Sequence, residues 1–266
     1  VVISPLIALQ RDQAKAIDEQ DVGDVAVINS AVPKSAREEA FAAAEDGTLE
    51  FIFLAPEQFD NPTTLERVHA AQPTLFVVDE AHCVSAWGHD FRPDYLRLGH
   101  VIEALGHPRV LALTATAAPP VRAEIVERLT MRDPKLIVQG FDRPNIAREV
   151  ERAGSKEQKW ALLAERVLDA GKPGIVYAAT RRHTEELAGL LAERGLRTAC
   201  YHAGMASGAR HEVETAFMDD QYDVLVATTA FGMGIDKPNV RFVFHAAISD
   251  SLDSYYQEIG RGGRDG

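Results

Sequence analysis

The sequence predicts an α/β protein with two parallel-sheet domains. Short apolar runs of strand length alternate with helical segments through most of the 266 residues. Such alternation indicates parallel strands joined by right-handed helical crossovers. It breaks once, at QGFDRPN (139–145), where Gly140 and Pro144 predict a turn-rich connector. We therefore expect a first domain over residues 1–140 and a second over residues 141–266.

The first half begins with an apolar run that reads as a buried strand. Runs of this type predict strands at residues 1–4, 24–29, 51–54, 74–78 and 109–113. Helices are expected at residues 5–20, 35–45, 94–105 and 119–129. Pro5 fits the first turn of its helix because the ring fixes φ at a helical value, and Gly47 is suited to end the second helix.

The second half repeats the alternation. Strands are expected at residues 174–178, 197–201, 223–228 and 241–245. Helices are expected at residues 156–170, 181–194 and 207–218, with a last one beginning near Asp253. Two sheets of this kind, joined by a short connector, predict a cleft between two domains.

Composition limits the environment and the partners. A hydrophobic fraction of 46% and a charged fraction of 26% predict a soluble globular protein, and no apolar run is long enough to span a membrane. Cys83 and Cys200 form no CxxC pair and no disulfide framework, so we expect a cytoplasmic location. The net charge of −12 opposes non-specific nucleic-acid binding, so any nucleic-acid contact must use a local track of donors. Both ends read as though cut from a longer protein.

Two adjacent carboxylates, Asp79 and Glu80, directly follow the predicted strand at residues 74–78. Open α/β sheets bind ligands at the carboxyl ends of their strands. There the first acid can hold Mg²⁺ and the second can polarise an attacking water. Alternatively, the pair caps the next helix and favours its dipole. The two residues by themselves leave both interpretations open.

Several longer motifs occur in a fixed order along the chain. They are ISPLIALQRDQ (3–13), FLAPE (53–57), DEAHCVSAWGHDFRPDY (79–95), ALTATA (112–117), FDRPNI (141–146), YHAG (201–204), TTAFGMGIDKPNVRFVFH (228–245) and YYQEIGRGGRDG (255–266). Together they make the chain resemble the RecQ family of DNA helicases over nearly its whole length. The DEAH box leading into an aromatic-rich loop, together with AFGMGIDKPNVR, is typical of RecQ-like proteins.

The resemblance implies two RecA-like domains with ATP and Mg²⁺ in the cleft, and ATP-dependent DNA unwinding of 3′→5′ polarity in recombination and repair. Asp79 would hold Mg²⁺ and Glu80 would activate the hydrolytic water. From the second domain, the motifs that correspond to nucleotide and transition-state contacts contribute Gly232, Gly234, Asp236, Gln257, Arg261 and Arg264. Asp236 replaces an Asn of some relatives, and Gly262 replaces the usual Ala.

The resemblance also implies a track for DNA and residues that couple it to the nucleotide site. These positions are Ser4, Pro5, His82, Thr114, Thr116, Arg181, His202 and Thr228. The aromatic-rich loop adds Trp87, His89, Phe91 and Arg92 as a DNA sensor. Local core packing is the alternative for the aromatic residues, and capping of the strand end is the alternative for the two threonines. Expected partners are single-stranded DNA and duplex junctions, with single-strand-binding and recombination proteins, at the nucleoid if the source is bacterial.

The sequence lacks the patterns of a structural zinc site and of a phosphate-binding loop. His82, Cys83, His89 and Asp90 do not have the spacing of a structural zinc site, so we expect no zinc within this chain. No G-x-x-x-x-G-K-[ST] phosphate loop occurs either, and we expect it upstream of Ser4. The parent protein would then hydrolyse ATP, whereas residues 1–266 alone would bind it poorly. A RecQ-like DNA-binding scaffold without ATPase activity and an RNA-directed helicase stay open as alternatives.

Overall fold

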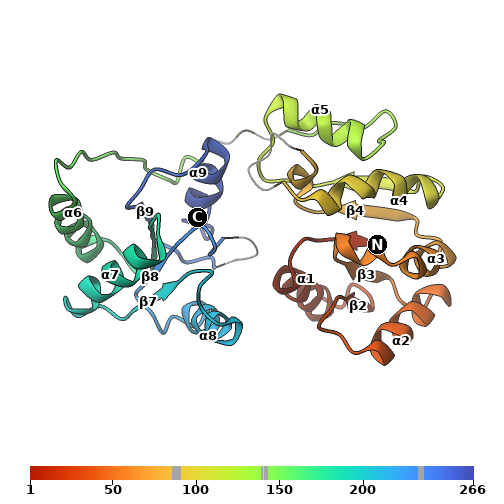
Figure 1. Ribbon diagram of the computed structural model, residues 1–266, viewed down its shortest axis with the longest axis horizontal. Coiled ribbons are helices and arrows are strands. Elements are labelled where there is room, and N and C mark those ends of the chain that lie inside the picture. Colours follow the sequence, from red (N-terminus) through yellow and green to blue (C-terminus); the bar gives the residue numbers. More distant parts are fainter. Residues whose placement is uncertain (86–90, 139, 141–142, 233–236) are drawn as a thin grey trace. The chain divides into compact units, whose positions relative to one another are not determined.

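The computed structural model describes residues 1–85, 91–138, 140, 143–232 and 237–266, apart from the side chain of Ala8 (Figure 1). The chain divides into two compact units, Val1–Val138 and Gln139–Gly266. Among the described residues, no helix combines the length and apolarity that a membrane crossing requires.

Unit 1 contains a five-stranded sheet in the order β2-β3-β1-β4-β5, and every pairing is parallel. The strands are β1 (Val2–Ile3), β2 (Val25–Ile28), β3 (Phe51–Leu54), β4 (Leu75–Val78) and β5 (Arg109–Ala112). The α-helices are α1 (Ile7–Glu19), α2 (Lys34–Glu45), α3 (Pro62–Ala70), α4 (Leu98–Ala104) and α5 (Pro119–Arg128). Short 3₁₀ helices η1 (Pro56–Asp60), η2 (Ala81–Val84) and η3 (Pro93–Arg97) connect them.

Helix α3 lies in a stretch for which the sequence analysis assigned no element. Asn61 caps it by accepting a hydrogen bond from the Thr63 backbone N–H, and Pro62 occupies its first turn. Val68 of this helix is buried in the core of unit 1. The helix therefore has both a local start signal and a core contact.

The two faces of the unit 1 sheet are buried to different extents. Side chains alternate between faces along β4, where Phe76 and Val78 are fully buried in the main core. Leu75 and, in the next strand, Leu111 are 42% and 43% exposed on the other face. Apolar side chains thus remain open on the face of β4 and β5 that is turned away from the core.

Unit 2 contains a four-stranded parallel sheet in the order β7-β8-β6-β9. The strands are β6 (Gly174–Tyr177), β7 (Thr198–Tyr201), β8 (Val224–Ala227) and β9 (Phe242–His245). The helices are α6 (Lys156–Asp169), α7 (Arg181–Ala192), α8 (Ser207–Met218) and α9 (Leu252–Ile259). The central strands β6 and β8 are buried throughout, with one apolar cluster on each face of the sheet. The predicted fold class, two parallel α/β sheets, is confirmed.

Candidate functional site

The carboxyl ends of β1, β3, β4 and β5 meet at one edge of the unit 1 sheet. Ile3 pairs with both Leu54 and Val78, so the residues that follow these strands lie side by side. The Asp79 N–H donates to the Ile3 carbonyl at 2.8 Å, and the Ser4 N–H donates to the Leu54 carbonyl at 3.1 Å. The predicted carboxylates and the Ser4 segment therefore share the edge at which parallel sheets bind ligands.

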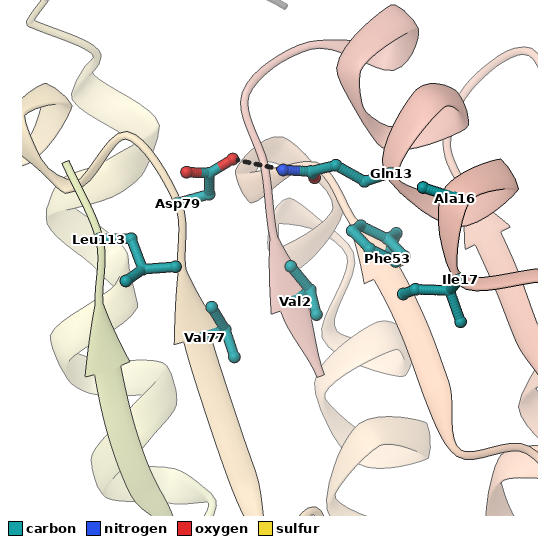
Figure 2. A pocket seen from close by; sticks show the side chains of 8 residues that line it. All are labelled: Val2, Gln13, Ala16, Ile17, Phe53, Val77, Asp79 and Leu113. Carbon is teal, nitrogen blue, oxygen red and sulfur yellow. Dashed lines mark hydrogen bonds between the residues drawn. The ribbon is translucent and has the colours of Figure 1, made fainter. Parts of the chain in front are cut away.

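Asp79 is held from three directions. Its Oδ2 accepts a hydrogen bond from Gln13 Nε2 of α1 at 3.0 Å (Figure 2), and its Oδ1 accepts from the Glu80 N–H at 2.9 Å. The Tyr95 hydroxyl donates to the Asp79 carbonyl at 3.0 Å. Burial raises the pKa of the Asp79 carboxyl, and the hydrogen bond from Gln13 opposes that rise. These hydrogen bonds orient the Asp79 carboxylate, but they do not fully offset the cost of burying its charge.

A pocket of about 300 Å³ lies beside this carboxylate, between α1 and the open sheet face, and Figure 2 shows the side chains that line it. Its lining consists of Val2, Gln13, Ala16, Ile17, Phe53, Val77, Asp79 and Leu113. Asp79 and Gln13 bring the polar groups to an otherwise apolar wall. Gln13 was not singled out from the sequence, although it belongs to the quoted segment 3–13.

Glu80 has a backbone conformation that is rare for its residue type. Its φ of +48° and ψ of 44° lie in the left-handed region, which costs a residue other than glycine about 1–3 kcal/mol. Its Oε2 is buried and has no well-directed hydrogen bond, although it lies 3.2 Å from His82 Nδ1. We interpret this as an electrostatic contact. Strain of this kind, together with an unsatisfied carboxylate oxygen, is typical of functional sites.

The capping alternative receives no support from this geometry. Glu80 stands at the N-cap of η2 but makes no capping hydrogen bond with its side chain. Asp79 accepts from the next residue along the chain and from Gln13, which lies in α1. Neither carboxylate therefore caps a helix.

His82 connects the DEAH box to the threonine motif after β5. It is buried, and its Nδ1 lies 2.9 Å from Thr114 Oγ1. Thr114 Oγ1 donates to the Thr116 carbonyl at 3.0 Å, so its oxygen is left to accept a hydrogen bond from His82 Nδ1–H. Thr116 is also buried, and its hydroxyl has no partner. The structure therefore brings His82, Thr114 and Thr116 together.

The predicted DNA-sensing loop falls partly outside the described residues, which exclude Trp87 and His89. Phe91 is 40% exposed, and Arg92 Nη1 donates to the Pro5 carbonyl at 2.9 Å. Ser4 is fully buried with an unpartnered hydroxyl. Arg92 thus links the end of this loop to the predicted phosphate-contact segment at Ser4 and Pro5.

In unit 2 the two predicted arginines differ in exposure. Arg261 is only 7% exposed, and a Cβ at Gly232 would stand 3.2 Å from its Nη2. Arg264 is exposed, with its Nε donating to the Gly260 carbonyl at 3.3 Å. Gln257 is half-buried on α9. Gly234 and Asp236 lie outside the described residues.

The loop that carries Arg264 is fixed by the connector segment. Arg143 Nη2 and Asn145 Nδ2 donate to the Gly263 carbonyl at 2.8 and 2.7 Å. Gly263 has a φ of +58°, which favours glycine, and its N–H donates to the Val240 carbonyl at 2.9 Å. The sequence analysis gave Arg143 and Asn145 no role, although the quoted FDRPNI segment contains both.

The predicted DNA contacts of unit 2 gather at the carboxyl end of β7. Arg181 opens α7, and a Cβ at Gly204 would stand 2.8 Å from its Nη1, so a side chain at that position would displace the guanidinium. His202 is buried, with Nε2 3.2 Å from Glu185 Oε1 and with Nδ1 unpartnered. Thr228 Oγ1 accepts from the Ala230 N–H at 3.4 Å.

The residues at the carboxyl edge of the unit 1 sheet fit Mg²⁺ with a nucleotide. Mg²⁺ is bound by one or two carboxylates together with phosphate oxygens, and Asp79 supplies one such oriented carboxylate. Gln13 Oε1 and Glu80 Oε2, neither of which accepts a hydrogen bond, are further oxygen acceptors at this edge. Within the described ranges, no group of three or more His, Cys, Asp or Glu side chains is arranged to hold a metal ion by itself.

Replacing Asp79 by asparagine is expected to raise the Tm of the ligand-free protein by a few degrees near neutral pH. The variant removes a carboxylate whose charge is disfavoured by burial. Rotation of the Gln13 amide would let its unpartnered Oε1 accept from the new amide. Because the folded-state pKa of Asp79 is raised, the difference in Tm should shrink as pH falls through it. Thermal unfolding between pH 4 and 8 measures this, and a pH-independent decrease in Tm would contradict it.

Comparisons with known proteins agree with this geometry. Residues 1–124 match the DEAD/DEAH box helicase family, and residues 158–266 match the helicase conserved C-terminal domain. A crystal structure of the DUF1998 helicase MrfA bound to DNA superposes with a TM-score of 0.75, covering 99% of this chain and 38% of that one at 19% identity. The fold and the two family matches define a helicase core.

Two relatives identify the type of helicase. The chain is 39% identical over its whole length to the probable ATP-dependent DNA helicase RecS of Bacillus subtilis, of which it covers 53%. It is 39% identical to the ATP-dependent DNA helicase RecQ of Pasteurella multocida, of which it covers 42%. The chain is therefore similar over its whole length to RecQ-like DNA helicases, and the two family matches make it a partial helicase core. It spans about half the length of the curated relatives it matches.

Proposed function

We propose that the protein to which this chain belongs is an ATP-dependent DNA helicase of RecQ type with 3′→5′ polarity. The observation that carries the proposal is the DEAH box, which places a held carboxylate, Asp79, beside a strained and unsatisfied one, Glu80, at the carboxyl edge of a parallel sheet. Similarity to RecQ-type helicases over the whole chain supports it. The protein would act on DNA in the cytoplasm, at the nucleoid if its source is bacterial.

The two carboxylates have separate roles in this proposal. Asp79 would hold Mg²⁺, which would supply positive charge to offset that of the nucleotide phosphates. Glu80 accepts a proton from the attacking water. Its unsatisfied Oε2 is available for that hydrogen bond, and its contact with His82 connects it to Thr114. Contacts thus run from Glu80 through His82 and Thr114 to Thr116. A shift of the threonine segment on DNA binding would change the surroundings of Glu80, which activates the water.

Arg264 is proposed to contact the γ-phosphoryl group during transfer, and Arg261 to support the same site. The difference in exposure favours this division, because an exposed guanidinium can reach a ligand whereas Arg261 lies against Gly232 in its own unit. A guanidinium stabilises the charge of the transferring phosphoryl group through paired hydrogen bonds.

The phosphate cradle is proposed to come from a segment outside this chain. The relatives are about twice as long, and the face of β4 and β5 beside Asp79 keeps Leu75, Leu111 and Leu113 exposed. Large apolar side chains gathered on one side of a sheet normally pack against another element. A covering element there would stand next to the Asp79 pocket, where the phosphates must lie.

Phe91 and Arg92 are proposed to report DNA binding to the nucleotide site. Phe91 is exposed and offers a ring on which a base can stack. Arg92 holds the Pro5 carbonyl, and its own N–H donates to the Cys83 carbonyl at 3.0 Å, next to His82. A displacement of this loop by DNA would therefore be transmitted to the DEAH box.

Replacing Phe91 by alanine in the full-length protein is expected to keep basal ATP hydrolysis and to reduce its stimulation by DNA at least about tenfold, since stacking contributes roughly 1–3 kcal/mol per base. Leu96→Ala, at a neighbouring exposed apolar position, is the matched control. Phe91 is the better position for the test because Arg92→Ala would also release the Pro5 segment. If DNA stimulated ATP hydrolysis by Phe91→Ala as strongly as by the parent, Phe91 would not be part of the DNA sensor.

The proposed function itself is tested by ATP hydrolysis of the full-length protein with and without single-stranded DNA. Hydrolysis that rises with DNA supports a motor, and DNA binding without any hydrolysis would identify a scaffold. Stronger stimulation by RNA of the same sequence would assign the protein to RNA.

A further inference from the structure

A buried carboxylate in unit 2 has no role in the proposal above. Glu258 stands on α9, directly after Gln257, and is only 6% exposed. Its Oε2 accepts hydrogen bonds from His245 Nε2 at 2.8 Å and from Ser249 Oγ at 2.5 Å. A buried charge is costly unless it is paired and hydrogen-bonded, so this arrangement ties α9 firmly to the segment after β9.

The histidine that Glu258 holds is itself fixed by aromatic contacts. His245 ends β9 and pairs in register with Tyr177, which ends β6. The two rings are stacked with centroids 5.6 Å apart and planes at 21°, and the Tyr255 ring lies 5.3 Å away on α9. The Tyr177 hydroxyl donates to the Phe231 carbonyl at 2.9 Å, one residue before Gly232. The cluster thus joins two strand ends to α9 and to the segment around Gly232.

Arg261 lies against this same cluster. It follows Glu258 by three residues, and its N–H donates to the Glu258 carbonyl at 3.3 Å. Its guanidinium packs at Gly232. The Tyr177 hydroxyl hydrogen-bonds the residue before Gly232, so the phenol and the guanidinium approach the same segment, and the charge of Arg261 opposes the rise that burial causes in the pKa of Tyr177. A small rotation of α9 about its axis would therefore move Gln257, Arg261 and the loop that carries Arg264.

We propose that Glu258 and His245 are positioning residues that fix α9 so that Arg261 and Arg264, in the segment that follows this helix, meet the nucleotide in one geometry. The inference rests on the proposed function. A displacement of about 1 Å in a group that stabilises the transition state can cost on the order of 100-fold in rate. Because the effect is on the transition state, it should appear in kcat and leave the KM for ATP nearly unchanged.

The test measures DNA-stimulated ATP hydrolysis and thermal unfolding of the full-length protein and its variants. Glu258→Ala is expected to lower kcat at least about tenfold, with the KM for ATP and the Kd for DNA within about twofold. Glu258→Gln keeps an acceptor oxygen for His245 and should retain most of the activity. Glu186→Gln is the control, because Glu186 also accepts hydrogen bonds from two side chains, those of Lys156 and Arg182, but lies on α7.

His245→Phe keeps the ring stack and removes the hydrogen bond, so it gives the same readout if Glu258→Ala does not fold. Glu258→Ala should also cost less than about twofold in an Arg264→Ala background, because the arginine that contacts the phosphoryl group is then already absent and the two effects are non-additive. If Glu258→Ala lowered kcat by the same factor in both backgrounds, this inference would be overturned and the proposed function would not. An unchanged kcat in a folded Glu258→Ala protein would have the same consequence. A parent protein without DNA-stimulated hydrolysis would overturn the proposed function and this inference together.

Discussion

Replacing Glu80 by glutamine in the full-length protein is expected to lower DNA-stimulated ATP hydrolysis by about 10²–10⁴-fold, the usual contribution of a general base. Glutamine keeps the size of the side chain but cannot accept the proton of the attacking water. Asp79, which is proposed to hold Mg²⁺, keeps its contacts with Gln13 and with the backbone of residue 80. Nucleotide affinity should therefore stay within a few fold of the parent, as measured by binding of ATP and its non-hydrolysable analogues.

The control for this variant is Glu45→Gln. Glu45 is also a carboxylate of unit 1, but it is paired with Arg67 at the end of α2. It should leave hydrolysis unchanged. If Glu80→Gln hydrolysed ATP at the parent rate while remaining folded, the water-activating role would belong to another residue, and the strained backbone at Glu80 would need a different explanation.

The second large effect is expected from Arg264→Ala, which should lower kcat by about 10³-fold or more, in the range known for arginines that enter a phosphoryl-transfer site. The guanidinium of Arg264 is exposed and its Nε donates to the Gly260 carbonyl, so its removal should lower Tm less than removal of the buried Arg261. Arg264→Lys should not restore the rate, because an ammonium cannot make the paired hydrogen bonds of a guanidinium.

Arg261→Ala provides the comparison within the same motif. Arg261 is buried against Gly232, so its removal should lower Tm as well as kcat. Arg197→Ala is the neutral control, since Arg197 is an exposed arginine of unit 2 whose partner is Asp223. An Arg264→Ala protein with the parent kcat, alongside an inactive but stable Arg261→Ala protein, would reverse the roles assigned to the two arginines.

Much of the fold could be predicted because its signals are local. Buried strands such as Leu75–Val78 and Val224–Ala227 are continuous apolar runs, and that pattern is visible without any tertiary information. Helix α3 also carries a local signal, Asn61 followed by Pro62, although the sequence analysis did not assign it. The connector was expected to end the first domain at residue 140, and the contact-based division falls after Val138.

The details of the site could not be predicted because they depend on packing between distant segments. Gln13 reaches Asp79 only once α1 is placed beside β1 and β4, 66 residues away in sequence. The left-handed backbone at Glu80 has no signature in its residue type. Arg261 and Arg264 are both arginines, three positions apart, so their residue type does not predict which one is buried. Arg261 is buried because it packs against Gly232 and its surroundings.

The central claim is that ATP hydrolysis at the DEAH box drives DNA strand separation. Its most direct test is unwinding of a labelled duplex by the full-length protein, comparing a 3′ single-stranded tail with a 5′ tail. We expect separation of the 3′-tailed duplex with ATP and Mg²⁺, little separation of the 5′-tailed duplex, and none with a non-hydrolysable analogue or with Glu80→Gln. Binding of both duplexes without ATP-dependent separation of either would contradict the account.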